Sequence, residues 1–428
     1  MATEARRMVA SGSALPLTSN TEASQRVVAA AREKCAQLAA SLSCRPVAIV
    51  LAGSFARNEG SVLALENRLQ ALGDMEFMVF FPAGSDLERL QTELTERART
   101  LRAELAGVAD CELEFGAVAP EYLRKLRPQI FGFELLTHGR TVWGDEKILA
   151  NAPRFPASRI PHFDAWRMIN NRLLEQLEWA DKIETAGRDQ LVRILYQLAK
   201  CYMDMGTAVL VFAGKYESTY RARANALRRL AEASADNDMR FAHPLSGRVA
   251  ECTAFKLAPS LAARPLGVRL DGDLQTLRED IRRALAEMVP VARSVWRWAA
   301  AQLSGQALET RMEDAELRNA ALATQPMREI LRGWLKVALM PKVRREPAFA
   351  RRMASLLTRG SPRYLTYCVA SELFFELPAA LAGGNPQLSA EHLLPVRFAE
   401  HASEPRAWWR LRAEALLGWR LFLRNEWA

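Results

Sequence analysis

The sequence is poor in the residues and patterns that mark several large classes of protein. It has six cysteines and five histidines among 428 residues, with no CxxC pair and no HExxH pair. Neither a disulfide framework nor a zinc site is therefore expected. No uncharged apolar run is long enough to cross a bilayer, and no tract of low complexity or repeat of fixed period is present. These absences predict a reduced, cytoplasmic protein without a membrane partner.

The chain also lacks a compact block of Lys and Arg, although its formal net charge is +9. An excess of positive charge favours anionic partners such as nucleotides or nucleic acid. The same excess spread along many helices is typical of solvated helix faces, and this is the simpler interpretation because no basic block stands out. Nucleic acid is therefore not the favoured partner, and the sequence does not indicate an oligomeric state.

What the sequence does contain is typical of a globular chain, with 50% hydrophobic and 25% charged residues. Its length predicts more than one domain. We expect an α+β protein in which a small mixed-sheet domain precedes a large helical part. The predicted divisions are a flexible N-terminus at 1–22, the α/β domain at 23–150, a helical domain at 151–300 and a helical C-terminal region at 301–428.

Hydrophobic periodicity supports this division. Apolar residues at helical spacing predict a helix over 22–42, and the apolar run at 47–51 predicts a strand. A second apolar run at 77–81 predicts another strand, and a helix capped by Ser85 or Asp86 should follow it to about Leu105. The alternation of apolar and acidic residues at 110–115 predicts a half-buried strand. From about His162 onward, helical periodicity dominates.

The first predicted strand ends in a turn of small residues. Gly53-Ser54 follows directly, and Arg57 lies one helical turn further on. A glycine at such a turn lets a phosphate approach the backbone, and exposed N–H groups with a hydroxyl favour an anion. The arginine is placed to reach a triphosphate. A helix-capping Ser54 and a surface Arg57 are the alternatives.

Four carboxylates accompany the next two predicted strands. Residues two apart on a strand point to the same face, with Cα atoms about 6.5–7 Å apart. Asp74 and Glu76 therefore share one face, and so do Glu112 and Glu114. If the strands are neighbours, three acids converge, and such a cluster is stabilised by a divalent cation such as Mg²⁺ or Mn²⁺.

These motifs resemble a known family. The run Leu51–Gly60 (LAGSFARNEG), followed by Asp74-Met75-Glu76-Phe77, is similar to the signature of the DNA-polymerase-beta-type nucleotidyltransferases. The resemblance covers about Pro46 to Asp145, where Glu134-Leu135 together with 139–145 looks like the segment that often closes this domain in stand-alone bacterial members. Two further segments, Tyr196-x-x-x-Lys200 and 214–223, resemble a helix and loop of members that modify antibiotics and other small molecules. The spacer between Ser54 and Asp74 is longer than usual in the family, and Glu76 and Glu114 stand where Asp is commoner.

The resemblance implies a site and a chemistry. Asp74 and Glu76 would hold two Mg²⁺ or Mn²⁺ ions, with Glu114 as the third acid, which holds the catalytic ion and helps to deprotonate the acceptor. Gly53 and Ser54 would cradle the phosphates of an NTP. Glu112 is the reserve for Glu114. Lys200 is either a contact to nucleotide or acceptor or a solvated helix residue.

The implied reaction transfers a nucleoside monophosphate from an NTP, with ATP favoured, to a hydroxyl of an acceptor that the sequence does not identify. A small-molecule acceptor is favoured. Two alternatives remain open: an interaction protein that keeps the nucleotidyltransferase fold without catalysis, and an RNA-tailing enzyme.

Overall fold

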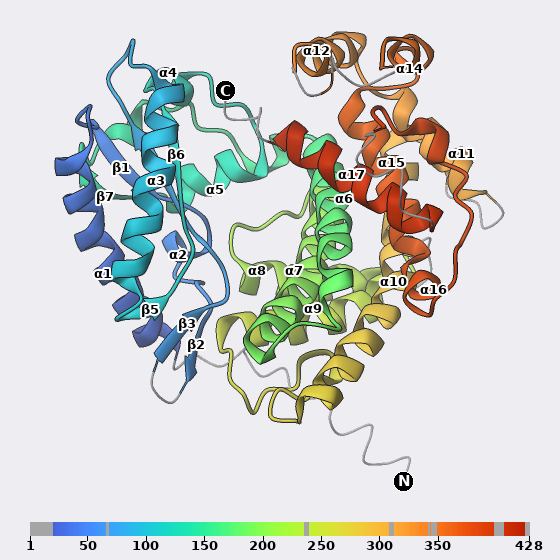
Figure 1. The fold of residues 1–428 in the computed structure, drawn as a ribbon, viewed down its shortest axis with the longest axis horizontal. Helices are drawn as coiled ribbons and strands as arrows, with labels where there is room; N and C mark the ends of the chain where they lie inside the picture. The colour runs from blue at the N-terminus through green and yellow to red at the C-terminus, as the bar shows by residue number, and fades with distance from the viewer. Residues whose placement is uncertain are drawn as a thin grey trace.

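The computed structural model describes residues 20–65, 68–234, 239–307, 312–340, 343, 349–397 and 406–423. An N-terminal part containing the strands lies beside a larger helical part (Figure 1). The α+β prediction is confirmed at this level. Of the segment predicted to be flexible, 1–22, residues 1–19 lie outside the described residues. The prediction is wrong for 20–22, which belong to helix α1 (Asn20–Ser41) because the helical spacing starts two residues earlier than expected.

The larger sheet has the strand order β6-β4-β1-β7. Strand β1 (Ala48–Leu51) pairs antiparallel with β4 (Met75–Phe80) and with β7 (Arg140–Gly144), while β4 pairs in parallel with β6 (Leu113–Val118). All four residues of β1 are buried, as expected for an apolar strand covered on both faces. The strands predicted at 47–51 and 77–81 are thus confirmed with small shifts in their bounds.

Helices cover both faces of this sheet, and the alternation of side chains along the strands decides what each face contacts. Ile49 and Phe77 belong to a core with α1 and α3 (Leu87–Leu105). Val50 and Met78 point the other way, into a smaller core with α4 (Glu121–Arg124) and α5 (Ile130–His138). The predicted cap of α3 is confirmed, because the carboxylate of Asp86 accepts a hydrogen bond from the backbone N–H of Arg89 at 3.1 Å.

A second sheet was not predicted. Strands β2 (Val62–Leu65) and β3 (Arg68–Ala71) form an antiparallel pair, and β5 (Ala109–Asp110) joins β3 in parallel. This pair occupies the long spacer between Ser54 and Asp74. The strand predicted at 110–115 is in fact two strands, because β5 pairs with β3 whereas β6 pairs with β4.

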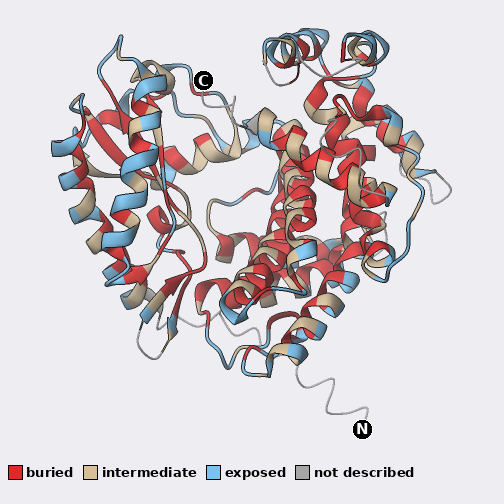
Figure 2. Cartoon of the chain, viewed as in Figure 1, coloured by how far each residue is buried: buried red, intermediate tan, exposed pale blue. Residues whose placement is uncertain are grey.

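The helical part begins at the predicted position, with α6 at His162. One hydrophobic cluster extends from Ile160 to Trp419, and it also includes Leu63 and Leu72 of the N-terminal part. Figure 2 shows the buried residues along the central helices, of which α7 is almost fully enclosed. The helices are α6 (His162–Trp179), α7 (Arg188–Phe212), α8 (Tyr220–Ala233), α9 (Ala242–Leu257), α10 (Leu274–Ser304), α11 (Asp314–Ala323), α12 (Met327–Ala338), α14 (Phe349–Leu356), α15 (Pro362–Phe375), α16 (Leu377–Leu381) and α17 (Ala407–Leu423).

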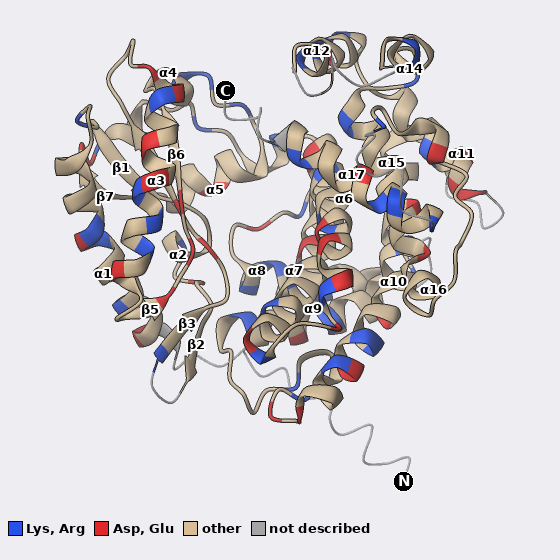
Figure 3. Ribbon diagram, viewed as in Figure 1, with Lys and Arg blue, Asp and Glu red and all other residues tan. Residues whose placement is uncertain are grey.

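In the described part of the chain, Lys and Arg are interspersed with Asp and Glu over both parts of the molecule (Figure 3). This distribution agrees with the interpretation of the positive excess as solvated helix faces. Among the residues that the structure describes, no helix has the length and apolar character needed to cross a membrane.

Candidate functional site

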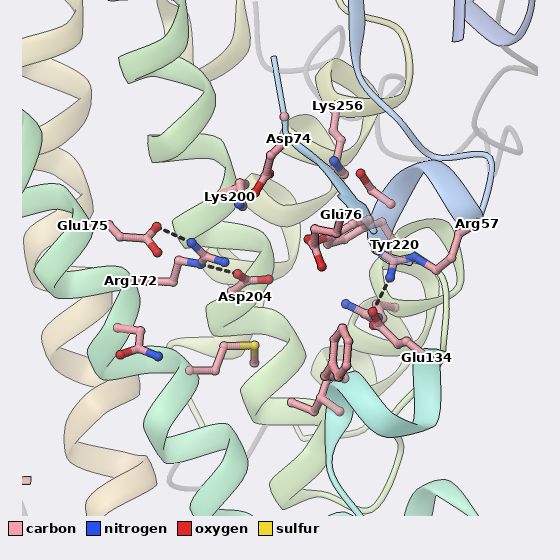
Figure 4. A pocket seen from close by; sticks show the side chains of 18 of the residues that line it. Arg57, Asp74, Glu76, Glu134, Arg172, Glu175, Lys200, Asp204, Tyr220 and Lys256 are labelled. Carbon is pink, nitrogen blue, oxygen red and sulfur yellow. Dashed lines mark hydrogen bonds and ion pairs between the residues drawn. The ribbon is translucent and has the colours of Figure 1, made fainter. Parts of the chain in front are cut away.

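A charged cavity of about 280 Å³ lies between the two parts of the molecule. Its walls come from the turn between β1 and the short helix α2 (Gly53–Ala56), the start of β4 and α5 on one side, and from α6, α7, α8 and α9 on the other (Figure 4). Of the predicted site residues, Gly53, Ser54, Arg57, Asp74, Glu76 and Lys200 all line it. Six acids and six bases face this space: Asp74, Glu76, Glu134, Asp164, Glu175 and Asp204, and Arg57, Arg167, Arg172, Lys200, Arg223 and Lys256.

The glycine-serine turn is in close contact with the acids. Helix α2 (Gly53–Ala56) starts at Gly53, whose φ is +65°, in the left-handed region that favours glycine. A Cβ at this position would lie 2.9 Å from Oε1 of Glu76. The backbone conformation therefore favours glycine, a side chain at this position would displace the Glu76 carboxylate, and the turn borders directly on the acid of β4.

This contact gives a testable prediction. Replacing Gly53 with Ala forces a left-handed alanine, at a cost of about 1–2 kcal/mol, and displaces the Glu76 side chain. We expect a lower free energy of unfolding in urea and weaker binding of an NTP with Mg²⁺. Gly107→Ala is the matched control, because an added Cβ there would meet no atom within 4 Å and the φ of Gly107 is outside the left-handed region. Equal losses in the two variants would contradict the assigned role of Gly53.

The three predicted acids come together at one end of the β4–β6 pair. Glu76 is directly opposite Glu114 in the parallel register. Asp74 immediately precedes β4 and faces the cavity, while Met75 and Phe77 are buried on the opposite face. Glu114 lies with Glu76 in an adjoining, mostly apolar cavity of about 410 Å³. Glu112 instead pairs with Arg102 of α3, so the geometry favours Glu114 over Glu112 as the third acid.

The acids affect one another's ionisation. Burial, followed by the charge of Asp74, raises the pKa of Glu76 to about 7, and desolvation and Asp74 likewise raise the pKa of Glu114 to about 7. Burial also opposes ionisation of Asp74, but Lys200 and Arg172 outweigh it and hold the pKa of Asp74 below its usual value. The cluster therefore favours the ionised form of Asp74 and disfavours simultaneous ionisation of the two glutamates.

This donor set fits a magnesium ion that also binds phosphate. In the described part of the chain, no three His, Cys, Asp or Glu side chains are grouped closely enough to hold a cation by themselves. Mg²⁺, however, commonly uses one or two carboxylates and completes its shell with waters and substrate phosphates. None of Asp74, Glu76 and Glu114 is in an ion pair with a described residue, and a cation would relieve the repulsion that raises the two glutamate pKa values.

The raised pKa values predict a pH dependence. Protons compete with a cation for Glu76 and Glu114, whose pKa values are about 7. We expect Mg²⁺-dependent binding of an NTP to strengthen from pH 6 to pH 8. At pH values below the pKa, the affinity should rise roughly tenfold for each unit of pH and for each carboxylate that must ionise to bind the cation. Calorimetric titration at several pH values measures this. Affinity that is unchanged, or that falls as the pH rises, would contradict it.

Two lysines face the acids from the helical wall. Lys200 of α7 lies beside Asp74 (Figure 4). Desolvation and Arg172 disfavour its charge, but Asp74 and Glu175 outweigh them and raise the pKa of Lys200 above its usual value. Lys256 of α9 is only 1% exposed, and its Nζ is 2.6 Å from Oη of Tyr196. Both lysines therefore bring positive charge to the side of the cavity opposite the turn.

A buried ion cluster fixes the turn to the helical wall. Glu134 of α5 pairs with both Arg57 and Arg223, and it accepts a hydrogen bond from Oη of Tyr216 at 2.6 Å. Burial opposes ionisation of Glu134, but the two arginines hold its pKa below its usual value. Arg57 also donates to Glu59 at 3.2 Å. Its observed partners are thus carboxylates, and its contact with phosphate stays a prediction.

The wall of the cavity formed by α6 is also held in place by ion pairs and hydrogen bonds. Arg172 of α6 pairs with Glu175 and with Asp204 of α7 (Figure 4). Oδ1 of Asn171 accepts hydrogen bonds from Oη of Tyr367 at 2.7 Å and from Nε1 of Trp419 at 3.0 Å. The C-terminal helices α15 and α17 therefore support the wall without lining the cavity.

Several of these residues were missed by sequence reasoning. Arg172 and Asp204 look like ordinary charged residues of amphipathic helices. The sequence did contain a sign for two others. Lys256 lies among apolar residues at the end of a helix (Ala254-Phe255-Lys256-Leu257), and Arg223 ends the 214–223 segment of the family resemblance.

Comparison with known proteins adds no assignment. No protein-family model, no curated protein and no solved structure matches this chain. The functional argument therefore rests on the motifs and on the geometry of the cavity.

Proposed function

We propose that this protein is a metal-dependent nucleotidyltransferase that moves a nucleoside monophosphate from an NTP, with ATP favoured, to a hydroxyl group. The observation that carries the proposal is the direct contact between the Gly53–Ser54 turn and Glu76, in a cavity that also contains Asp74 and Lys200. A turn suited to phosphate, carboxylates suited to a cation and a buried lysine are the groups that phosphoryl transfer requires.

Each residue has a defined role in this reaction. Asp74 and Glu76 would hold Mg²⁺, which when bound neutralises phosphate charge and stabilises the leaving oxygen. The backbone N–H groups at Gly53 and Ser54, with the Ser54 hydroxyl, would bind the β- and γ-phosphates, and Lys200 would add positive charge from the opposite wall.

Glu114 would act as the base. The acceptor hydroxyl oxygen bonds to the α-phosphorus, the bond from that phosphorus to the β-phosphate oxygen breaks, and pyrophosphate leaves. The hydroxyl proton passes to Glu114, whose pKa of about 7 suits proton transfer near neutral pH. A small-molecule acceptor remains favoured, because the cavity walls carry equal numbers of acids and bases rather than a basic track for nucleic acid.

The proposal is tested by thermal unfolding in the presence of each NTP, with and without Mg²⁺ or Mn²⁺. A rise in melting temperature that requires both the metal and a nucleotide supports it, because a ligand that binds only the folded state stabilises that state. The double variant Asp74→Asn/Glu76→Gln should lose this rise. No shift across the whole panel would contradict the proposal.

A further inference from the structure

Helix α12 carries an uncovered apolar face. Its residues Met327, Leu331 and Leu335, together with Leu339 just after it, recur every four positions and are 56%, 50%, 62% and 65% exposed. These four make up most of the exposed large apolar side chains in the described part of the chain, where the others are Val108 and Leu261. Residues four apart lie on the same side of a helix, so the four form one stripe. A concentrated stripe of this kind marks an interaction surface.

The exposed stripe does not result from poor packing of α12. The opposite face of α12 is firmly anchored, with Ile330, Trp334 and Val337 at most 4% exposed. Nε1 of Trp334 also donates a hydrogen bond to the carbonyl of Gly360 at 2.9 Å. The helix therefore has one apolar face for the core and a second, separate one toward solvent.

Cations run alongside the exposed stripe. Arg328, Arg332 and Lys336 follow at the same spacing of four, and all three are exposed. Glu329 is the only acid within α12. The helix lies with α14 at one extremity of the molecule, away from the cavity (Figures 1 and 3).

We propose that α12 docks on an anionic membrane surface, with its leucines at the boundary between headgroups and acyl chains and its cations against acidic headgroups. A helix with an apolar stripe flanked by Lys and Arg is suited to lie in this interface. A second copy of the chain fits less well, because two such faces would bring cations against cations. This proposal departs from the expectation of no membrane partner, which rested on the lack of a run long enough to span a bilayer and did not consider a helix that lies on the surface.

Co-sedimentation of the full-length chain with vesicles tests this proposal. Binding to vesicles of phosphatidylcholine mixed with phosphatidylglycerol should exceed binding to phosphatidylcholine alone and should fall as salt is added. Arg328→Gln/Arg332→Gln/Lys336→Gln should weaken binding by on the order of a hundredfold, since each cation at an acidic leaflet contributes about fivefold. Leu331→Ser/Leu335→Ser should abolish binding, whereas the matched control Leu261→Ser should not change it.

Thermal unfolding of every variant verifies that the fold is retained, which is expected because the substituted side chains are exposed. Three results would overturn the proposal: no binding of the wild-type chain to either kind of vesicle, binding that the α12 variants leave unchanged, or a wild-type dimer that the leucine variant dissociates. Capture of an acidic amphipathic peptide without any vesicle binding would also overturn it in favour of a protein partner.

Discussion

Asp74→Asn/Glu76→Gln is expected to reduce nucleotidyl transfer by about a thousandfold or more. Both substitutions keep the size of the side chain and remove a negative charge that would hold the cation. Loss of several kcal/mol of stabilisation of the transferring phosphate corresponds to this factor. The measurement is the release of pyrophosphate from an NTP with Mg²⁺, together with the second product, which is free nucleoside monophosphate when water is the acceptor and its glycerol ester when glycerol is the acceptor.

A second variant and its matched control come from Glu114 of the neighbouring strand β6 and from Glu112, which directly precedes that strand. Glu114→Gln should also be strongly impaired, because Glu114 is opposite Glu76 and is the proposed base. Glu112→Gln should retain activity, because Glu112 pairs with Arg102 at the surface. Activity that survives in the double variant, or that is lost in Glu112→Gln but kept in Glu114→Gln, would contradict the assigned roles.

Glu134→Gln is expected to lower the free energy of unfolding by about 3–5 kcal/mol, because it leaves Arg223 as a buried charge with no other ion pair in the described part of the chain and leaves Arg57 with Glu59 alone. Denaturation in urea measures the loss. Glu287→Gln is the control: Glu287 pairs with Arg248 at the surface, with side chains 46% and 37% exposed, so its loss should stay within about 1 kcal/mol.

The same substitution has a defined pH dependence. The pKa of Glu134 is lowered in the folded protein. Its contribution to the free energy of unfolding is therefore fully present above the ordinary glutamate pKa, and it is lost as the pH falls through the lower pKa of the folded protein. The difference in stability between wild type and Glu134→Gln should therefore shrink in acid. A difference of less than about 1 kcal/mol at neutral pH would show that the cluster does not hold the two parts together.

The elements that the sequence predicted best are those with a simple period. The strand at 47–51 is uniformly apolar, and the acids at 74 and 76 flank a residue buried in the core, so their placement on one face followed from alternation. The pairing of β4 with β6 could only be assumed from the sequence. The register of Glu76 with Glu114 depends on contacts between distant segments, which a local pattern does not contain.

The parts that the sequence did not predict depend on tertiary contacts. The β2–β3 pair is short, and its Leu63 is stabilised by packing into the helical core rather than by local propensity. Lys256, Arg172 and Arg223 reach the cavity from helices that lie far from Gly53 in the chain. Arg172 lies in an ordinary amphipathic helix, which gives no local sign of whether a charged residue faces solvent or a cavity wall, so it could be found only from the assembled structure. The apolar surroundings of Lys256 and the resemblance that includes Arg223 were signals, but neither shows that the residue reaches the cavity.

The central claim is that Asp74 and Glu76 hold a cation beside the phosphate-binding turn. Electron paramagnetic resonance of Mn²⁺ with the non-cleavable analogue α,β-methylene-ATP tests it most directly. Adding the wild-type protein to the Mn²⁺–analogue mixture should convert the signal to that of protein-bound Mn²⁺, and Asp74→Asn/Glu76→Gln should fail to do so. Equal conversion by the wild type and the variant would contradict the account.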